Sequence, residues 1–201
     1  DKLCIVMEYL KGSSMKKYVK QPIVYFKLIS FYSQMMNGLN YIHKSGFAHS
    51  DIKPDNIVVS NSIIKYIDFG LSCFKNANLY VASCNERKIA GTGSYQPPGM
   101  VKRMPSIYTF SGRKAADVWS LVLVMYQMAN ARRFYYFDKT LPKQDIANNI
   151  LKGDYYPSNY PYENNKYINE FLDSAIDMKP DTRETSEELL KRFSAIFDNH
   201  Q

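Results

Sequence analysis

The stretch HSDIKPDN, residues 49–56, places an imidazole, two carboxylates, an ammonium group and a carboxamide within one short polar segment. Apolar, β-branched runs follow it at NIVVS and at IIKYIDFG, and these runs predict two short strands. A loop held by such strands is rigid enough to present side chains to a ligand. The sequence therefore predicts a fixed polar loop, with Asp68 at the end of the second strand.

The oxygen donors of this region suit a divalent cation. Asp51 and Asn56 lie in the loop, which Pro54 stiffens, and Asp68 lies near the end of a strand. Because two strand ends can point at one pocket, we expect the carboxylates and the carboxamide to converge. Hard oxygen ligands favour Mg²⁺, which commonly takes phosphate oxygens as further ligands. The pattern therefore predicts a magnesium and phosphate site.

These residues, in this order, resemble the catalytic motifs of the eukaryotic-type protein kinase family, and specifically of its serine/threonine type. The resemblance implies ATP and Mg²⁺ as cofactors and a protein as substrate. It implies that Asp51 accepts the proton of the substrate hydroxyl and that Lys53 steadies the transferred phosphoryl group. Asn56 and Asp68 would hold the metal ions that bridge the nucleotide phosphates.

Two further segments look like the parts of a kinase that contact substrate and adenine. GTGSYQPPG, residues 91–99, is similar to the substrate-docking segment, in which Thr92 would link the catalytic aspartate and lysine. VMEYL resembles the strand and hinge that contact adenine, with Met7 as gatekeeper and the backbone of Glu8 and Leu10 as adenine partners. Val58 would form part of the adenine floor.

The remaining matched residues have supporting roles in the family. His49 would pack under Phe69, and Gly70 completes the Asp-Phe-Gly motif. Arg183 resembles the arginine that precedes the final helix. Asp117 is chemically a plausible acid or base, but its place on a buried helix favours bracing of the catalytic loop by hydrogen bonds.

The expected fold class is α+β, a protein-kinase-like fold with a mainly helical C-terminal lobe, a few short strands and an N-terminal lobe largely absent. Residues 1–12 would form the last strand of the N-terminal lobe and the hinge, and residues 13–201 the C-terminal lobe. LCIVMEYL, residues 3–10, is expected to be a buried strand. Without the family's Gly-rich loop and strand lysine, this chain alone is expected to bind ATP weakly.

Apolar residues at helical spacing predict the other elements. The series that predicts a helix ending at Gly46 is Leu28, Tyr32, Met35, Leu39 and Ile42. Further helices are expected over residues 117–129, 143–152, 168–178 and 186–197. The last of these begins with a capping-box pattern at Thr185 and Glu188. Residues 71–105 are expected to form a long loop.

Ser50 departs from the family pattern, because an arginine usually stands between the histidine and the aspartate. In many kinases that arginine pairs with a phosphorylated residue of the activation loop. A serine cannot hold a phosphate dianion in this way. We therefore expect activity that does not depend on phosphorylation of Ser83, Thr92 or Ser94.

Gly99 is a second departure, since the family has a glutamate there that pairs with the later arginine. A buried guanidinium without a partner would be costly. Arg183 is therefore expected to find another carboxylate or to turn to solvent.

Composition narrows the class of protein and its partners. A chain of 201 residues with 45% hydrophobic content fits one folded domain, and no apolar run is long enough to span a membrane. The net charge of +7 comes from dispersed pairs such as Lys16-Lys17, so neither DNA, RNA nor a membrane is an expected partner. The oligomeric state stays open.

Cysteine usage bears on the compartment. Cys4, Cys73 and Cys84 form no CxxC pair, and their odd number indicates a reducing environment. We expect three free thiols and an intracellular, cytoplasmic protein, located in the host cytoplasm if the source is a virus or a parasite.

Two functions follow from the residues and the resemblance. The leading hypothesis is a protein serine/threonine kinase that transfers the ATP γ-phosphate to a protein hydroxyl. The alternative is a catalytically weak kinase-like lobe that binds a protein partner through the aromatic residues between Tyr155 and Tyr162.

Overall fold

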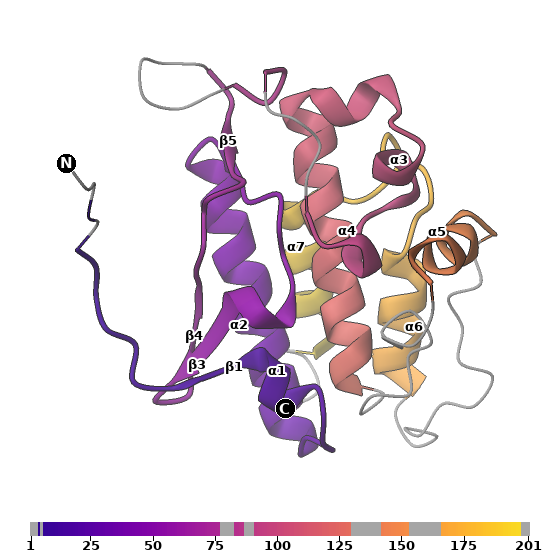
Figure 1. Ribbon diagram of the computed structural model, residues 1–201. Helices are drawn as coiled ribbons and strands as arrows, with labels where there is room; N and C mark the ends of the chain where they lie inside the picture. The colour runs from indigo at the N-terminus through magenta and orange to yellow at the C-terminus, as the bar shows by residue number, and fades with distance from the viewer. Residues whose placement is uncertain are drawn as a thin grey trace.

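The computed structural model of the chain describes residue 4 and residues 6–76, 83–86, 91–129, 142–152 and 166–197. Helices dominate these residues, and the strands are short (Figure 1). The α-helices are α1 Met15–Tyr18, α2 Tyr25–Lys44, α3 Pro98–Val101, α4 Phe110–Ala129, α5 Lys143–Lys152, α6 Lys166–Ala175 and α7 Ser186–Phe197. The strands are β1 Ser13–Ser14, β2 Phe47–Ala48, β3 Ile57–Ser60, β4 Ile63–Tyr66 and β5 Cys73–Phe74. The 3₁₀ helices are η1 Pro54–Asn56, η2 Gly93–Tyr95 and η3 Pro105–Tyr108.

Helix α2 follows the predicted apolar spacing. Its buried face includes all five residues of the predicted series, Leu28, Tyr32, Met35, Leu39 and Ile42. The helix ends where expected, because Gly46 has a φ of +86° and a side chain there would lie 2.8 Å from the ring of Phe74. Only glycine fits this turn without strain. The turn then leads directly into β2.

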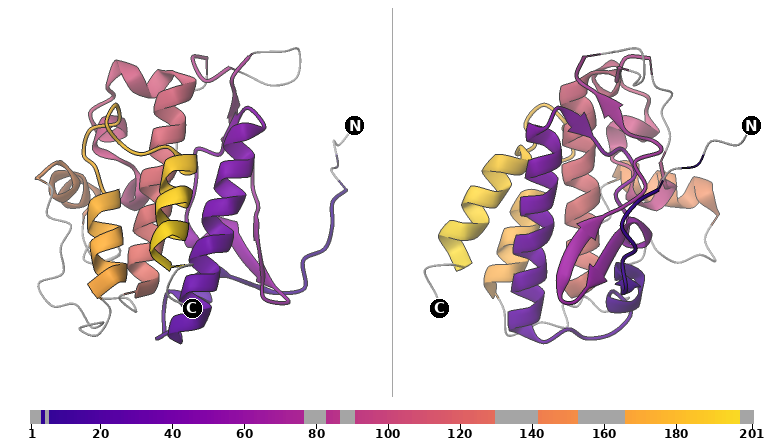
Figure 2. Two further views of the ribbon diagram at one scale, coloured as in Figure 1. Left: turned by 180° about the vertical axis from the view of Figure 1, so that it is seen from behind. Right: turned by 90° about the vertical axis from the view of Figure 1, so that its left-hand side faces the viewer.

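Helix α4 is the centre of the core. From Ala115 to Ala129 every residue is buried, since α2, η3 and α6 pack around it. Helix α2 also packs against α7, so α2 contacts both α4 and α7 (Figure 2). A helix that is apolar on all sides is expected to be surrounded in this way. This arrangement gives the loops around α4 a rigid support.

Two small sheets carry the polar loop. In the first sheet β3 pairs antiparallel with both β1 and β4, and in the second β2 pairs antiparallel with β5. The β3–β4 hairpin turns at Asn61 and Ser62, which both have positive φ, as a tight two-residue hairpin turn requires. The two short strands predicted from NIVVS and IIKYIDFG are present as β3 and β4.

The prediction of a buried strand over residues 3–10 is wrong for the residues that the structure describes. Val6, Met7 and Tyr9 are exposed, and residues 6–10 belong to no strand. The segment extends away from the helical body (Figure 1). A strand needs a hydrogen-bonded neighbour, and none of the described residues pairs with this segment.

Other element boundaries differ in detail. The expected loop over residues 71–105 contains the short elements β5, η2 and α3. Helix α4 begins at Phe110 rather than near Asp117, because the Thr109 hydroxyl accepts a hydrogen bond from Gly112 N at 3.0 Å and caps the first turn. Helix α7 has the predicted bounds, and its capping box joins Thr185 N to the Glu188 carboxylate at 2.8 Å.

The prediction of three free thiols is wrong. Cys73 and Cys84 form a disulfide with their Cα atoms 4.8 Å apart, and Cys4 is free and exposed. The sequence separation of 11 residues gave no sign of pairing. The two residues meet because β5 and the residue before Cys84 lie side by side, through a bridge between Phe74 and Ser83.

Arg183 is buried and does not turn to solvent. Its guanidinium donates hydrogen bonds to the carbonyl oxygens of Asp177 and Ala115, and it lies 5.0 Å from the Trp119 ring centroid. Burial alone would raise the pKa of Asp177, but hydrogen bonds from Thr182 and the Lys179 backbone, with the charge of Arg183, lower it. Backbone carbonyl oxygens and the charge of the Asp177 carboxylate thus stabilise the buried guanidinium.

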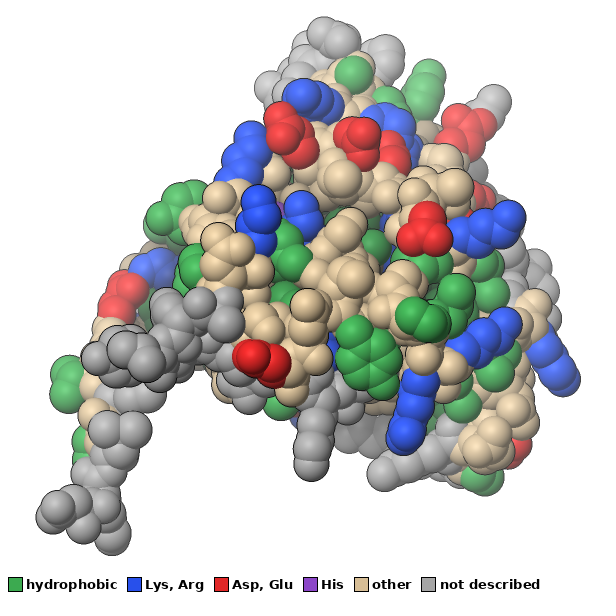
Figure 3. Space-filling model, turned by 90° about the horizontal axis from the view of Figure 1, so that it is seen from above, with side chains coloured by type: hydrophobic (Ala, Val, Ile, Leu, Met, Phe, Trp, Pro, Cys, Tyr) green, Lys and Arg blue, Asp and Glu red, His purple; other side chains and the backbone are tan. Residues whose placement is uncertain are grey.

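Charge is mixed on the face shown in Figure 3, where Lys and Arg side chains alternate with Asp and Glu side chains. The net charge of +7 is therefore not gathered into one basic patch on this face. Among the described residues, no helix combines the length and the apolar character that crossing a membrane would need.

Candidate active site

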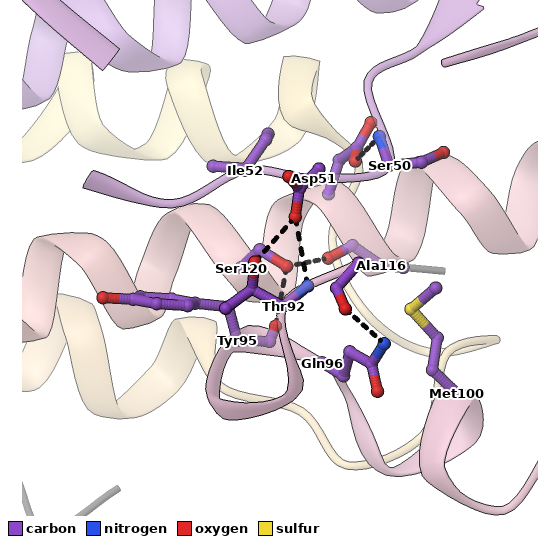
Figure 4. Close-up of a pocket in the computed structure, with 11 residues that line it drawn as sticks. Ser50, Asp51, Ile52, Thr92, Tyr95, Gln96, Met100, Ala116 and Ser120 are labelled. Atoms are coloured by element: carbon purple, nitrogen blue, oxygen red, sulfur yellow. Dashed lines mark hydrogen bonds between the residues drawn. The ribbon is translucent and has the colours of Figure 1, made fainter. Parts of the chain in front are cut away.

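Asp51 is the centre of a hydrogen-bonded cluster between the polar loop and the segment that begins at Gly91 (Figure 4). Lys53 Nζ lies 2.5 Å from Asp51 Oδ2 and 3.0 Å from Thr92 Oγ1. Thr92 donates from its backbone N and its hydroxyl to Asp51 Oδ1, both at 3.0 Å. Asn56 donates from Nδ2 to Asp51 Oδ2 at 3.0 Å. The four predicted residues therefore meet around one carboxylate.

The protonation state of Asp51 follows from these contacts. Burial alone would raise its pKa, but the hydrogen bonds from Lys53 and Thr92 and the charge of Lys53 outweigh burial and hold the pKa below its ordinary value. The carboxylate is therefore ionised at neutral pH. An ionised carboxylate can accept a hydrogen bond from a hydroxyl and orient it.

Asn56 and Asp68 emerge at the same end of the β3–β4 hairpin. Ile57 pairs with Tyr66, and beyond this pair Ile67 N donates to Asn56 O at 3.0 Å. Asn56 uses its amide nitrogen to bond Asp51, which leaves the amide oxygen as its acceptor atom. Asp68 has a φ of 60° and is exposed, with Oδ1 accepting a bond from Gly70 N at 3.2 Å. The hairpin register thus brings two oxygen donors to one edge.

The donor set can be tested for a metal ion. Among the described residues, no group of three or more His, Cys, Asp or Glu side chains could hold one alone. The Asn56 and Asp68 oxygens fit Mg²⁺, which prefers hard oxygen ligands and is often bound by few protein groups. An ion here would complete its coordination with oxygens of a ligand such as a phosphate.

His49 and Asp117 hold the loop from below. His49 is fully buried, with Nδ1 3.3 Å from Asp51 N and Nε2 3.1 Å from Ile67 O. Because Asp51 N donates to Nδ1, the ring carries its proton on Nε2 and donates to the carbonyl. Asp117 accepts from His49 N at 2.7 Å and from Ser50 N at 2.8 Å. These are the contacts that the expected bracing role of Asp117 requires.

His43 is a residue that the sequence analysis missed. Its Nε2 lies 3.0 Å from Asp117 Oδ2, and its Nδ1 lies 2.9 Å from Ser186 Oγ at the start of α7. It therefore connects α2, α4 and α7 behind the polar loop. The apolar series of α2 gave no signal for this role, because the partners lie far away in the sequence.

The other supporting residues lie near the loop. The Phe69 and His49 ring centroids are 4.8 Å apart, so the two rings are in contact as expected, although Phe69 is partly exposed. A side chain at Gly70 would approach Asp68 Oδ1 to 3.1 Å. Ser50 has a φ of 66°, and its buried hydroxyl makes no hydrogen bond with any described residue.

The structure does not gather the expected adenine partners into a pocket. Met7 and Glu8 are exposed, and the Glu8 carboxylate binds Lys65 Nζ at 2.5 Å. Val58 is half-buried in β3 opposite Lys65, so Glu8 contacts the same hairpin that carries Val58. Leu10 is half-buried. The aromatic residues of the alternative binding surface, residues 155–162, lie outside the described residues.

Comparison with known proteins identifies the family to which the chain belongs. A family model described as "Protein kinase domain" matches residues 1–193. The chain belongs to the protein kinase family. The expected kinase fold is thereby shown, and in this kinase chain the helical lobe makes up most of the described residues.

Several curated relatives of the chain are named serine/threonine-protein kinases. A probable serine/threonine-protein kinase of Clostridium acetobutylicum is 29% identical, over 98% of this chain and 29% of the relative. Nek11 of Homo sapiens is 27% identical over 95% of this chain and 28% of the relative, and TIO of Arabidopsis thaliana is 27% identical over 90% and 13%. This kinase chain thus spans less than a third of the length of these relatives.

Proposed function

We propose that the protein is a serine/threonine kinase that transfers the γ-phosphate of ATP to a protein hydroxyl. The observation that carries the proposal is the Asp51 carboxylate, which is buried, ionised and bonded to both Lys53 and Thr92. This carboxylate has both a cation and a hydroxyl as partners, and Asp51 and Thr92 line a small pocket.

Asp51 orients the substrate hydroxyl in this proposal. Its low pKa makes it a weak base, so it acts as a hydrogen-bond acceptor that aligns the hydroxyl and takes the proton as the new bond forms. The bonds from Thr92 fix the carboxylate before the substrate arrives. Catalysis then depends on positioning rather than on strong basicity.

Lys53 serves both the carboxylate and the transferred group. Its ammonium group bonds both Asp51 and Thr92, so it lies next to the carboxylate that would accept the hydrogen bond of the substrate hydroxyl. A positive charge in this place lowers the energy of the negative charge that spreads over the phosphoryl oxygens. Because Lys53 also bonds Thr92, the position of the lysine depends on the position of the docking segment.

Asn56 and Asp68 would hold Mg²⁺ with their side-chain oxygens. When bound, the ion neutralises the charge of the nucleotide phosphates. The β3–β4 hairpin sets the separation of these two residues, and the bond from Ile67 N to Asn56 O fixes it. Adenine would lie against Val58 and the segment of Met7, Glu8 and Leu10, which has no packing partner among the described residues beyond the hairpin.

The test is a phosphorylation assay of the full-length protein with ATP, Mg²⁺ and a panel of protein substrates. Asp51→Asn is expected to lower kcat by about 10²- to 10⁴-fold, because the amide cannot take the proton. Asp55→Asn is the matched control, since Asp55 lies in the same loop but is exposed and paired with Lys16. It should leave kcat within about twofold.

Two outcomes would contradict the proposal. One is equal activity of the wild type and Asp51→Asn. The other is no phosphate transfer by the wild type to any substrate, together with ATP binding that Asp68→Asn leaves unchanged. Either result would favour the alternative of a binding module.

A further inference from the structure

The disulfide between Cys73 and Cys84 joins two parts of the molecule that the catalytic proposal does not use. Cys73 lies in β5, and Cys84 lies in the turn of residues 83–86. Both residues are buried, and they form a small apolar cluster with Ala48, against which Phe110 packs. The disulfide is thus part of a packed site rather than an exposed link.

One end of the disulfide is fixed to the strand that leads into the catalytic loop. Cys73 pairs with Ala48 in the β2–β5 ladder, and Ala48 directly precedes His49. Next to Cys73, the Ser72 hydroxyl donates to His49 O at 3.2 Å. The position of Cys73 is therefore tied to the backbone that carries Asp51.

The other end is a turn held mainly by its own atoms. Glu86 N donates to Ser83 O at 3.1 Å, and Ser83 N donates to the Glu86 carboxylate at 3.1 Å. Its described links to the rest of the chain are the bridge between Ser83 and Phe74, the disulfide, and the contacts of Cys84 in the apolar cluster. Loss of the covalent link would leave one bridge and the weak packing of a small side chain.

Anchoring this turn affects Thr92, which follows it along the chain and binds Asp51 and Lys53. Thr92 follows Cys84 by 8 residues and Phe74 by 18 residues, so the disulfide places a fixed point closer to Thr92 along the sequence. By the loop-closure relation, a separation about half as long favours closure by roughly a factor of three. Ser50 supplies no cation that could anchor the segment through a phosphate instead.

We propose that Cys73 and Cys84 form a reversible thiol–disulfide site, whose disulfide holds the turn of residues 83–86 against β5 and favours the docked position of Thr92. The effect on catalysis rests on the proposed kinase function. Formation of the disulfide and order in the turn do not. Thiol–disulfide exchange runs in both directions, so the same site can open again when thiols are in excess.

The chemistry needs a low-molecular-weight disulfide, such as oxidised glutathione, as oxidant. The Cys84 thiol first loses its proton to solvent. The resulting thiolate attacks one sulfur of the oxidant and expels a glutathione thiolate. The Cys73 thiolate then attacks the Cys84 sulfur of the mixed disulfide and expels the second glutathione thiolate. Two protein thiols are oxidised, one glutathione disulfide is reduced, and the two protons end on the two glutathione molecules.

The experiment equilibrates the full-length protein in buffers of increasing oxidised-to-reduced glutathione ratio. Rapid alkylation and mass spectrometry measure the fraction of Cys73–Cys84 disulfide, and hydrogen exchange measures protection of residues 83–86. We expect reversible formation of the disulfide, exchange about tenfold slower in the oxidised form, and kcat/KM about threefold higher in it.

Two variants make the result specific. Cys84→Ser should match the reduced wild type in exchange and in kcat/KM at every ratio, whereas Cys4→Ser, which removes the exposed free thiol, should respond like the wild type. The reduced wild type serves as the reference should Cys84→Ser fold poorly.

The proposal is overturned if both cysteines remain alkylatable at every ratio, or if reduction leaves exchange at residues 83–86 unchanged. A disulfide that protects the turn in a protein without phosphate transfer in either redox state would support this site and refute the kinase proposal. The two proposals therefore fail separately.

Discussion

The polar loop, residues 49–56, and the opening segment, residue 4 and residues 6–10, differ in how the rest of the chain supports them. The loop is polar in sequence, yet it is largely buried and bonded to α4 and to Thr92. The opening segment is apolar in sequence, yet Met7 is 74% exposed and belongs to no element. Burial here follows the available partners rather than the hydrophobicity of the segment.

This difference separates two halves of the proposed chemistry. The groups that would act on the hydroxyl and the phosphates are positioned by contacts within the described residues. The groups that would bind adenine have almost no such contacts. The chain therefore holds its proposed phosphate-transfer residues in place more firmly than its proposed nucleotide-binding residues.

The largest effect should come from removing Asp117, which holds the backbone of the polar loop. Asp117→Ala leaves the buried N–H groups of His49 and Ser50 and the His43 ring without their acceptor. We expect the free energy of unfolding to fall by about 3–5 kcal/mol, measured by urea denaturation. Asp117→Asn keeps one acceptor oxygen and should lose less.

Asp181→Ala is the control for this change, because that aspartate is exposed. It should alter stability by no more than about 0.5 kcal/mol. A loss below about 1 kcal/mol in Asp117→Ala would show that the loop does not depend on α4, and the contrast with the opening segment would disappear.

A pair of methionines tests the opening segment against the core directly. Met35→Ala removes a fully buried side chain of α2 and should cost about 2–5 kcal/mol. Met7→Ala removes the same side chain from an exposed position and should change stability by less than about 0.5 kcal/mol. The comparison uses one residue type, so intrinsic differences between side chains cancel. A cost above 1 kcal/mol for Met7→Ala would mean that the opening segment packs against the chain in solution.

The motif residues could be predicted because their spacing is local. Asp51, Lys53 and Asn56 lie in one loop, and a hairpin of fixed register brings Asp68 to Asn56. The helices were predicted where an apolar series or a capping box marks them, as in α2 and α7.

The misses share a physical cause, since each depends on three-dimensional partners that the local sequence pattern does not set. His43 needs Asp117 and Ser186, and Cys73 needs a turn that places Cys84 beside β5. The strand expected over residues 3–10 had the right composition, but no described strand lies next to it.

The smallest effect concerns the charge state of the loop. Hydrogen bonds and the charge of Lys53 keep the pKa of Asp51 below its ordinary value, so this group adds stability at neutral pH that is lost as the pH falls through the folded-state pKa. In Lys53→Met, burial still raises the pKa while the main opposing contribution is gone. The Asp51 titration should therefore move to higher pH, and acid unfolding should begin at higher pH. Carboxyl NMR titration measures the first and urea midpoints between about pH 3 and 7 the second.

Lys16→Met is the matched control for this last change, because it removes the same charge from an exposed pair with Asp55. It should leave the Asp51 titration in place, since a surface pair is screened by solvent. If Lys53→Met does not raise the pKa of Asp51, the two bonds from Thr92 alone set its ionisation. The position of Thr92, rather than the lysine, would then control the ionisation of Asp51, and under the redox proposal the state of Cys73 and Cys84 would act on this pKa as well.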